Sequence, residues 1–374
     1  MQNGGPFYGE SFPAGAACGR ALGRHTFTGG ALNLFYTASG FECSFTGSEL
    51  HLCLRAGASA HEPWISVLLN GAWIARFPVT AGESEICLFR GLTPGVARHV
   101  RVLKDVQAMP DEPDHFLQIT ALGVRDGEFL PLPAPAYRLE FIGDSITSGE
   151  GAIGAKQEED WVSAFFSAVP HYARLTAEAL GAEWRIISQS GWGLLSGWDN
   201  DPRHRVMDYY EQVCGVAAGA HNAALGAQQP YDFAAWPADA VIINLGTNDE
   251  GAMNNPPWTD PVTGENHAQR PTPEHLAALE QKAVDVLKTV RAHNPGAQIV
   301  WACGMLSDTN GRMPPLLRAA VARYRAETGD GRALYLPLPA ATPETLGARQ
   351  HPGAACHRQA AETLAACLRD LLKA

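Results

Sequence analysis

Clustered positive charge and long apolar runs are missing from this sequence of 374 residues. Lysine and arginine together number 28 against 39 acidic residues, so the formal net charge is -11. A protein that binds nucleic acid or an anionic membrane needs clustered Lys and Arg to neutralise phosphates, so we expect neither as a partner. A neutral substrate such as a sugar ester is compatible with this charge.

The sequence also lacks the features that direct a chain into or across a membrane. No uncharged run approaches the length that crosses a bilayer, and Met1–Phe7 has neither a basic nor an apolar segment typical of a secretory signal. We therefore expect a soluble, cytoplasmic protein, or a secreted one if a signal peptide has been removed. The oligomeric state is left open.

Closely spaced cysteine pairs are absent as well. The eight cysteines show neither a C-x-x-C pair nor a spacing typical of zinc sites, and several stand in apolar patterns where cysteine acts as a small hydrophobe. We expect structural thiols rather than disulfides, and no metal site. The cysteines are Cys18, Cys43, Cys53, Cys87, Cys214, Cys303, Cys356 and Cys367.

The first third of the chain has the period-two alternation of β-strands with turn residues between them, and no helical stretch. Between two of the strands stands Asn70-Gly71, a pair typical of tight hairpin turns. About eight strands without a helix predict an all-β sandwich of jelly-roll type. The expected strands are Ala31–Tyr36, Phe41–Phe45, Glu49–Leu54, Trp64–Leu69, Ala72–Ala75, Glu85–Phe89, Ala97–Leu103 and Phe116–Leu122.

A proline-rich segment, Phe129–Pro135, predicts an extended linker, because proline disfavours helix and cannot donate to a β-ladder. We therefore expect a β-sandwich domain over residues 1–133 and a second domain over residues 134–374. In the second domain buried strands alternate with helices, which predicts an α/β fold of three layers with a parallel sheet between helices. The expected strands include Trp184–Ser188, Ala240–Leu245, Gln298–Cys303 and Ala333–Leu336, and the expected helices Tyr172–Leu180, one opened by Thr272-Pro273, Pro315–Thr328 and Arg358–Leu372.

Two insertions, Asp201–Trp236 and Gly251–Arg270, interrupt this alternation just after strand ends. Loops at that edge of an open α/β sheet surround its ligand site, so the insertions either shape a substrate groove or decorate the surface.

The residues that carry chemistry follow the ends of predicted strands. Ser145 stands in a small-residue turn after an apolar run, which is how such sheets present a nucleophile. A serine needs donors for the oxyanion and a base. Backbone N–H groups of Gly191 and Ser145 and the side-chain amide of Asn248 are candidate donors. His351, followed by proline between the last strand and the last helix, is the candidate base.

In this order, these residues resemble the four conserved blocks of the SGNH (GDSL-type) hydrolases. The longer stretches Phe141–Gly149 and Val241–Asp249, with His351-Pro352 and an all-β domain in front, are similar to carbohydrate esterase family 2. The resemblance implies a flavodoxin-like sheet, with Ser145 as nucleophile, Gly191 and Asn248 as oxyanion donors and His351 as base. The implied activity is removal of O-acetyl groups from acetylated oligosaccharides of xylan or mannan type, without a cofactor.

One departure from the family pattern concerns the acid that usually precedes the histidine by two or three positions. Ala348, Arg349 and Gln350 stand there, and none is acidic. Either a carboxylate distant in sequence orients His351, or a backbone carbonyl near Gln350 accepts its Nδ1 proton. We favour the carbonyl, which makes the pair a Ser/His dyad.

Several neighbouring residues allow structural readings. Asp144 is expected as a turn or cap residue and Asp249 as a structural hydrogen-bond partner. Trp192, between two glycines, either stacks on a sugar ring or packs in the core. The histidines His171, His204, His221 and His267 lack metal-ligand spacing and are expected on the surface or in the groove.

Two alternatives to an acetyl esterase remain. A lipase or thioesterase with the same catalytic block would prefer long acyl chains, although the polar insertions favour a groove over an acyl tunnel. An inactive, carbohydrate-binding protein with this fold is the other.

Overall fold

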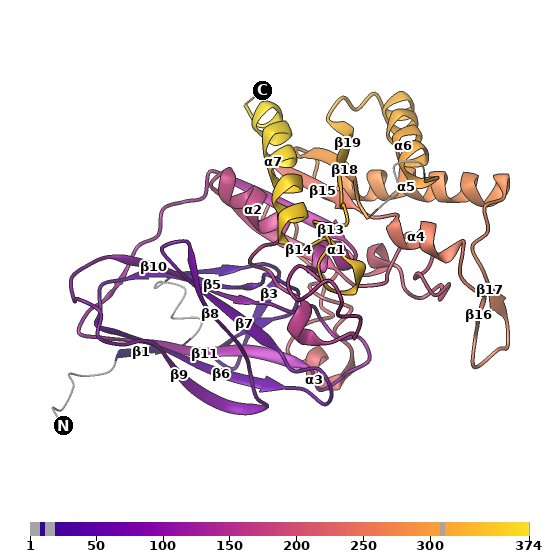
Figure 1. The fold of residues 1–374 in the computed structure, drawn as a ribbon. Coiled ribbons are helices and arrows are strands. Elements are labelled where there is room, and N and C mark those ends of the chain that lie inside the picture. Colours follow the sequence, from indigo (N-terminus) through magenta and orange to yellow (C-terminus); the bar gives the residue numbers. More distant parts are fainter. Residues whose placement is uncertain (1–7, 12–18, 307–310, 374) are drawn as a thin grey trace. The chain divides into compact units, whose positions relative to one another are not determined.

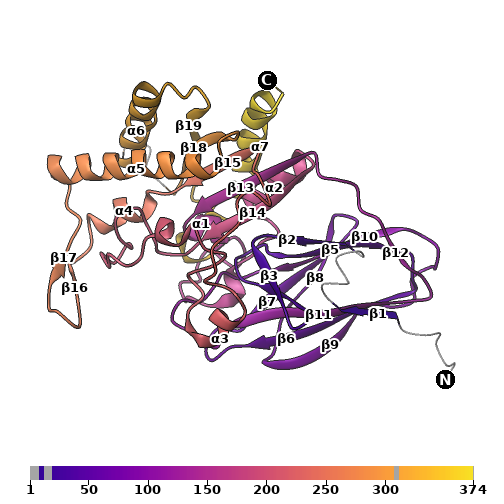
Figure 2. The same ribbon diagram turned by 180° about the vertical axis from the view of Figure 1, so that it is seen from behind.

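The computed structural model describes residues 8–11, 19–306 and 311–373, and Cys18 lies outside these ranges. The chain divides into two compact units (Figures 1 and 2). Unit 1 holds the described chain up to Ala134 together with Val162–Ala164 and Gln212–Pro230, and unit 2 holds the rest. The sequence analysis placed the domain boundary between residues 133 and 134; the structural division follows Ala134.

The described residues of unit 1 form two antiparallel sheets of six strands each. The first has the order β3-β4-β11-β6-β9 with β1 added to β11, and the second has the order β12-β5-β10-β7-β8 with β2 added to β5. The strands are β1 Tyr8–Ser11, β2 Gly19–Leu22, β3 His25–Thr28, β4 Ala31–Leu34, β5 Gly40–Phe45, β6 Glu49–Gly57, β7 Trp64–Leu69, β8 Ala72–Pro78, β9 Gly82–Phe89, β10 Arg98–Lys104, β11 Phe116–Arg125 and β12 Phe129–Leu130.

The core of unit 1 lies between the two sheets, because each strand turns alternate side chains inward. Leu50, Leu52 and Leu54 of β6 are fully buried in one apolar cluster with Phe41 and Phe45 of β5, which belongs to the other sheet. All eight strands predicted from the alternation are present.

The predicted linker is wrong in its first two residues. Phe129 and Leu130 form β12, which pairs with Phe45 and Ser44 of β5. The prolines that follow end the ladder, so only the part from Pro131 onward lies outside named strands until β13 begins.

The middle of the first insertion, Gln212–Pro230, belongs to unit 1. Its Leu225 carbonyl accepts hydrogen bonds from Thr26 Oγ1 at 2.5 Å and Asn33 Nδ2 at 3.2 Å, and the Gln212 carbonyl accepts one from Arg24 Nη1 at 2.7 Å. Helix α3, Gly219–Ala224, lies within it. This segment is therefore tied by buried polar contacts to the β-sandwich, a role that neither sequence-based alternative described.

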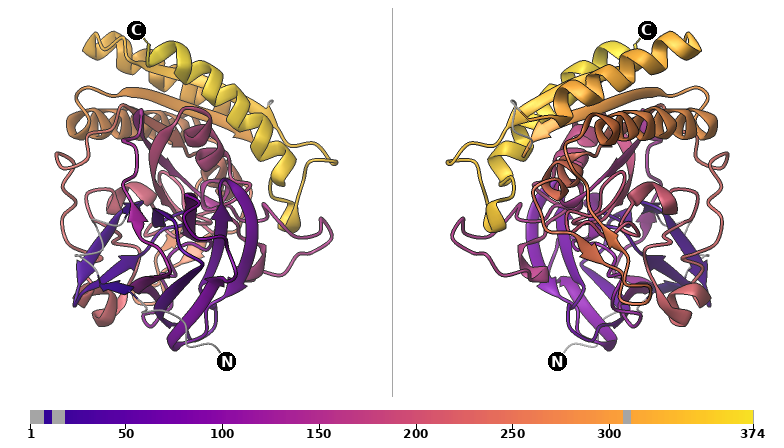
Figure 3. Two further views of the ribbon diagram at one scale, coloured as in Figure 1. Left: turned by 90° about the vertical axis from the view of Figure 1, so that its left-hand side faces the viewer. Right: turned by 90° about the vertical axis from the view of Figure 1, so that its right-hand side faces the viewer.

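In the described residues, unit 2 is built on a five-stranded parallel sheet with the order β14-β13-β15-β18-β19. Helix α2 packs with α7, and helix α5 packs with α6. Helices cover the sheet on both faces (Figure 3). The elements are β13 Tyr137–Gly143, α1 Ser145–Ser148, α2 Tyr172–Ala179, β14 Ala182–Ser188, β15 Ala240–Asn244, α4 Thr247–Ala252, β16 Trp258–Thr259, β17 Asn266–His267, α5 Pro273–His293, β18 Gln298–Met305, α6 Met313–Thr328, β19 Ala333–Ala340 and α7 Ala354–Leu371.

Local sequence explains these elements. All five residues of β15 are buried, as expected for a central parallel strand covered on both faces. Thr272 caps α5 by accepting a hydrogen bond from His275 N at 3.3 Å, and Pro273 occupies the first helical position, as predicted. In the described part of the chain, no helix combines the length and apolarity that a membrane span needs.

The first strand along the chain in this sheet, β13, has β14 on one side and β15 on the other. The connection from β13 to β14 therefore runs one way along the sheet, and the connections from β15 to β18 and β19 run the other way. Where they diverge, the carboxyl ends of the strands form a crevice. In both pairings Gly143, the last residue of β13, lies opposite the last residue of the neighbouring strand, Ser188 or Asn244. Three strands thus end at one level, and three loops start there.

A cross-strand ion cluster in unit 1 yields a test of the sandwich. Glu42 of β5 is 4% exposed and accepts hydrogen bonds from Arg20 Nη1 at 2.8 Å and Arg101 Nε at 2.9 Å. Burial alone would raise the pKa of Glu42, but hydrogen bonds from His99 and Arg101 outweigh it and lower that pKa to about 2. The folded state therefore favours the ionised carboxylate.

We predict that Glu42→Gln lowers the free energy of unfolding at pH 7 by about 3 kcal/mol. Because the folded-state pKa is depressed from 4.5, the stabilisation is complete above about pH 5 and is lost as the pH falls toward 2. Urea unfolding followed over this range measures it, with the exposed Glu83→Gln as control. An equal deficit at pH 7 and at pH 2 would contradict the prediction.

Candidate active site

Ser145 is the first residue of α1, two positions beyond the end of β13, and it is 6% exposed. Asp144 caps this short helix, since its Oδ1 accepts a hydrogen bond from Ile146 N at 3.0 Å. Gly149 ends the helix in the left-handed conformation. The strand, the cap and the glycine hold the Ser145 hydroxyl at the carboxyl edge of the sheet, and Asp144 has the cap role expected of it.

Asp144 lies in an acidic environment. Burial raises the pKa of its carboxyl to about 7, and the charges of Asp249 and Glu150 add to that effect. Its second oxygen, Oδ2, is buried and makes no hydrogen bond within the described residues. Burial close to the nucleophile therefore disfavours the charged form of this carboxyl.

His351 lies within hydrogen-bond distance of the serine: its Nε2 is 2.9 Å from Ser145 Oγ. Its Nδ1 is 2.8 Å from the carbonyl oxygen of Arg349. A carbonyl can only accept, so in the neutral ring the proton lies on Nδ1 and the lone pair of Nε2 points at the serine hydroxyl. This is the tautomer that a general base requires. Of the two alternatives for orienting His351, the structure has the backbone carbonyl.

The turn that carries this carbonyl is strained. Arg349 and Gln350 both have positive φ, at 55° and 54°. The left-handed conformation costs about 1–2 kcal/mol for a residue with a Cβ, so two in succession persist only with support. The support comes from Arg349: its N–H donates to Glu158 O at 2.6 Å, its Nη1 to Glu159 O at 2.7 Å and its Nε to Glu150 Oε1 at 2.6 Å.

Two glycines let the histidine turn approach the nucleophile turn closely. A Cβ on Gly151 would lie 2.3 Å from Ala348 O and 2.5 Å from the Cβ of His351. A Cβ on Gly347 would lie 1.9 Å from Gly151 O. Any side chain at either position would push His351 away from Ser145.

Glu150 is a residue that the sequence analysis missed. Its side chain is 3% exposed, and besides holding Arg349 it places Oε2 3.9 Å from His351 Nε2. Glu150 therefore lies beside both the base and the residue whose carbonyl orients it. Its position directly after the stretch Phe141–Gly149, five residues from Ser145, was the only signal in the sequence.

The candidate oxyanion donors Gly191 and Asn248 follow the ends of the two strands that flank β13. Gly191 follows β14 with φ of 78°, and its carbonyl accepts a hydrogen bond from Trp198 N at 2.9 Å. Asn248 is the second residue of α4, after β15, and its Nδ2 donates to Trp192 O at 3.0 Å. This bond fixes the orientation of the Asn248 amide and leaves its second N–H available to a ligand.

The side chain of Asp249 stabilises the loop that carries Gly191. This buried carboxylate accepts hydrogen bonds from Leu194 N at 2.8 Å, Leu195 N at 2.9 Å and Gln269 Nε2 at 3.0 Å. Asp249 is thus a structural hydrogen-bond partner, as expected. Gln269, at the end of the second insertion, also donates to Ser196 Oγ at 2.7 Å, so this insertion stabilises the loop of the candidate site.

The two tryptophans of that loop differ in exposure. Trp192 is 5% exposed and stacks on His204, with ring centroids 5.1 Å apart. Trp198 is 54% exposed, and a Cβ on Gly191 would lie 2.9 Å from its Cδ1. Of the two readings of Trp192, its burial favours packing, and the exposed ring beside Gly191 is that of Trp198, which the sequence analysis did not single out.

The expected exposure of the histidines is wrong for His171. It is fully buried at the N-terminal end of α2, with Nε2 3.2 Å from Ile146 O of the nucleophile helix. His204 is partly buried against Trp192, and His221 is exposed. Burial of His171 depends on tertiary packing that no local pattern records.

We predict that Glu150→Gln lowers kcat about ten- to a hundredfold with little change in KM, because it releases Arg349 and displaces the base by a fraction of an ångström. Steady-state kinetics with 4-nitrophenyl acetate measures this. The exposed Glu158→Gln, whose backbone carbonyl still accepts from Arg349, is the matched control. Equal kcat in Glu150→Gln and the parent protein would show that the ion pair has no positioning role.

Residues 141–359 match the GDSL-like lipase/acylhydrolase family. An acetyl xylan esterase from the rumen bacterium Butyrivibrio proteoclasticus has a solved structure that superposes with a TM-score of 0.95, at 38% identity over 99% of both chains.

Two curated relatives are longer than this chain. The cellulase/esterase CelE of Acetivibrio thermocellus is 27% identical over 90% of this chain and 37% of its own length. An acetylxylan esterase / glucomannan deacetylase of Cellvibrio japonicus is 25% identical over 62% of this chain and 61% of its own length. The family match covers more than half of the chain and includes Ser145, Gly191, Asn248 and His351. The chain therefore belongs to the GDSL-like lipase/acylhydrolase family.

Proposed function

We propose that this protein is a serine esterase that removes O-acetyl groups from oligosaccharides derived from plant polysaccharides of xylan or mannan type. The observation that carries the proposal is the pair of hydrogen bonds made by His351, to Ser145 Oγ at 2.9 Å and to Arg349 O at 2.8 Å. The similarity to an acetyl xylan esterase over the whole chain supports the choice of acetyl esters.

In the proposed first half-reaction, Ser145 Oγ attacks the acetyl carbonyl carbon while His351 Nε2 takes the hydroxyl proton. The carbonyl oxygen becomes an oxyanion, which the N–H groups of Gly191 and Ser145 and the Asn248 amide stabilise. The intermediate collapses when the bond to the sugar oxygen breaks. His351 then gives its proton to that oxygen, leaving an acetylated serine and a free sugar hydroxyl.

In the second half-reaction a water molecule attacks the acetyl group. His351 takes one proton from the water, and a second oxyanion forms and collapses. The proton on His351 returns to Ser145 Oγ as acetic acid leaves, and the acid then loses its remaining proton to the solvent as acetate. Atoms and charges balance without a cofactor. The Arg349 carbonyl keeps the Nδ1 proton in place throughout, and the Glu150 carboxylate, 3.9 Å from Nε2, favours the transient imidazolium.

We predict that Ser145→Ala lowers acetate release from acetylated xylo- and manno-oligosaccharides by roughly 10³-fold or more, because no other group forms the acyl intermediate. A coupled acetate assay measures the rate, and circular dichroism checks that the variant is folded. An unchanged rate would exclude this site as the source of activity.

The acyl-chain preference separates the alternatives. An acetyl esterase hydrolyses 4-nitrophenyl acetate faster than the octanoate, whereas a lipase or thioesterase does the reverse. An inactive sugar-binding protein hydrolyses neither and gives no burst that depends on Ser145.

Trp198 is the proposed sugar platform. An exposed indole next to an oxyanion donor can stack on the apolar face of a pyranose ring, a contact of about 1 kcal/mol. We predict that Trp198→Ala raises KM for acetylated oligosaccharides roughly fivefold and leaves KM for 4-nitrophenyl acetate within about twofold. Trp73→Ala, at an exposed tryptophan of β8, is the control. An equal rise of KM for both substrates would exclude stacking.

A further inference from the structure

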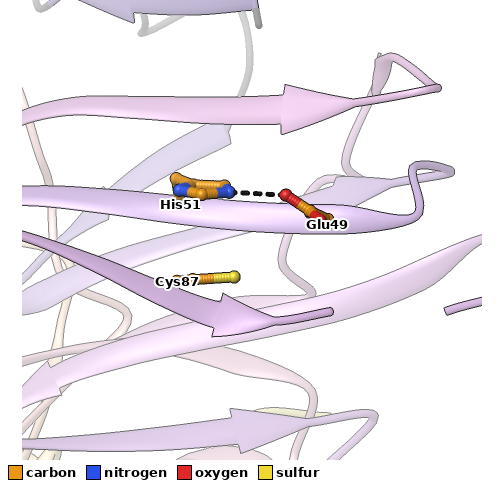
Figure 4. Close-up of side chains that lie close together, drawn as sticks. All are labelled: Glu49, His51 and Cys87. Carbon is orange, nitrogen blue, oxygen red and sulfur yellow. Dashed lines mark hydrogen bonds and ion pairs between the residues drawn. The ribbon is translucent and has the colours of Figure 1, made fainter. Parts of the chain in front are cut away.

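A second group of chemically reactive side chains lies in unit 1, on the sheet face that points away from the apolar core. Glu49 and His51 of β6 and Cys87 of β9 each offer one donor atom, and these atoms all lie within 4.8 Å of one another (Figure 4). The strands pair directly here, since His51 is opposite Cys87 in the antiparallel register. The alternation that buries Leu50 and Leu52 brings all three side chains to the outer face.

The hydrogen bonds of His51 resemble those of a metal ligand. Nδ1 is 2.9 Å from Glu85 Oε1, and Nε2 is 2.9 Å from Glu49 Oε2. If Nδ1–H donates to Glu85, the lone pair of a neutral Nε2 faces a carboxylate oxygen, and two acceptors then repel each other. Something positive must lie between them, either a second ring proton or a metal cation.

Two arginines hold the Glu49 carboxylate in place. The Glu49 carboxylate accepts from Arg125 Nε at Oε2 and from Arg90 Nε at Oε1, each at 3.1 Å. Its side chain is 16% exposed, and that of His51 is 10% exposed. Outer contacts that orient a ligating carboxylate and a ligating imidazole are typical of protein metal sites.

We propose that this cluster binds a divalent cation of the zinc class, with His51 Nε2, Glu49 and Cys87 Sγ as ligands and water in the fourth position. Imidazole, thiolate and carboxylate suit Zn²⁺, whereas Mg²⁺ and Ca²⁺ prefer oxygen alone. Glu85 becomes the outer carboxylate on the Nδ1–H of the ligating histidine.

Binding replaces protons in this proposal. The Cys87 thiol loses its proton to solvent, as does Nε2 if it was protonated, and the cation takes their place. The ligands come from two strands, and the paired residues His51 and Cys87 are 36 positions apart in the sequence. No local spacing motif therefore indicated the site.

The test uses the full chain without a histidine tag, freed of metal by a chelator and then titrated with Co²⁺. A thiolate ligand gives a near-ultraviolet charge-transfer band, and tetrahedral cobalt gives strong visible bands. We expect both bands to saturate at one Co²⁺ per chain, and Zn²⁺ to abolish them by displacement.

The variants identify the ligands. Cys87→Ser is expected to lose the charge-transfer band, and Glu85→Gln to keep the band but weaken binding about 10- to 100-fold. Cys367→Ser, at a partly exposed cysteine of unit 2, is the control and should match the parent protein. Absence of the band in the parent protein, or its persistence in Cys87→Ser, would overturn the proposal and leave the cluster as a group of hydrogen-bonded side chains without a metal.

Discussion

The hydrogen bond between the His351 ring and the Arg349 carbonyl determines what the sheet edge can do chemically. It assigns the ring proton to Nδ1, and so gives Nε2 the lone pair that can accept the proton of Ser145. A carboxylate in that place would also offset the positive charge that forms on the ring, whereas a carbonyl offers only a dipole. The buried Glu150 carboxylate, 3.9 Å from Nε2, is a full charge within range of the imidazolium.

The turn before His351 has a strained backbone, and contacts with neighbouring residues stabilise it. Two successive left-handed residues, Arg349 and Gln350, turn the 349 carbonyl back toward the ring that follows. The guanidinium of Arg349 donates a hydrogen bond to Glu150, which is only five residues beyond Ser145. This contact links the turn that carries His351 to the turn that carries Ser145. Gly151 and Gly347 make the close approach possible. Orientation of the base therefore depends on a whole loop rather than on one acid.

The sequence was most informative where structure follows from local pattern. Strict alternation around Leu50, Leu52 and Leu54 predicts a strand with one buried face, and Ser145 and Asn248 were identifiable because each follows the end of a buried strand. What could not be predicted depends on contacts distant in sequence. Every residue has a carbonyl, so nothing marks that of Arg349 in advance. The packing of residues 212–230 on the sandwich and the burial of His171 likewise arise only from the tertiary fold.

The tautomer of His351 tests this account most directly. Nitrogen-15 NMR of the histidine rings, at a pH where the ring is neutral and with His351→Gln for assignment, distinguishes the two forms by the shifts of Nδ1 and Nε2. The account predicts a ring protonated at Nδ1, with Nε2 showing the shift of an unprotonated nitrogen. A ring protonated at Nε2 would contradict it, because that nitrogen could then not accept the proton of Ser145.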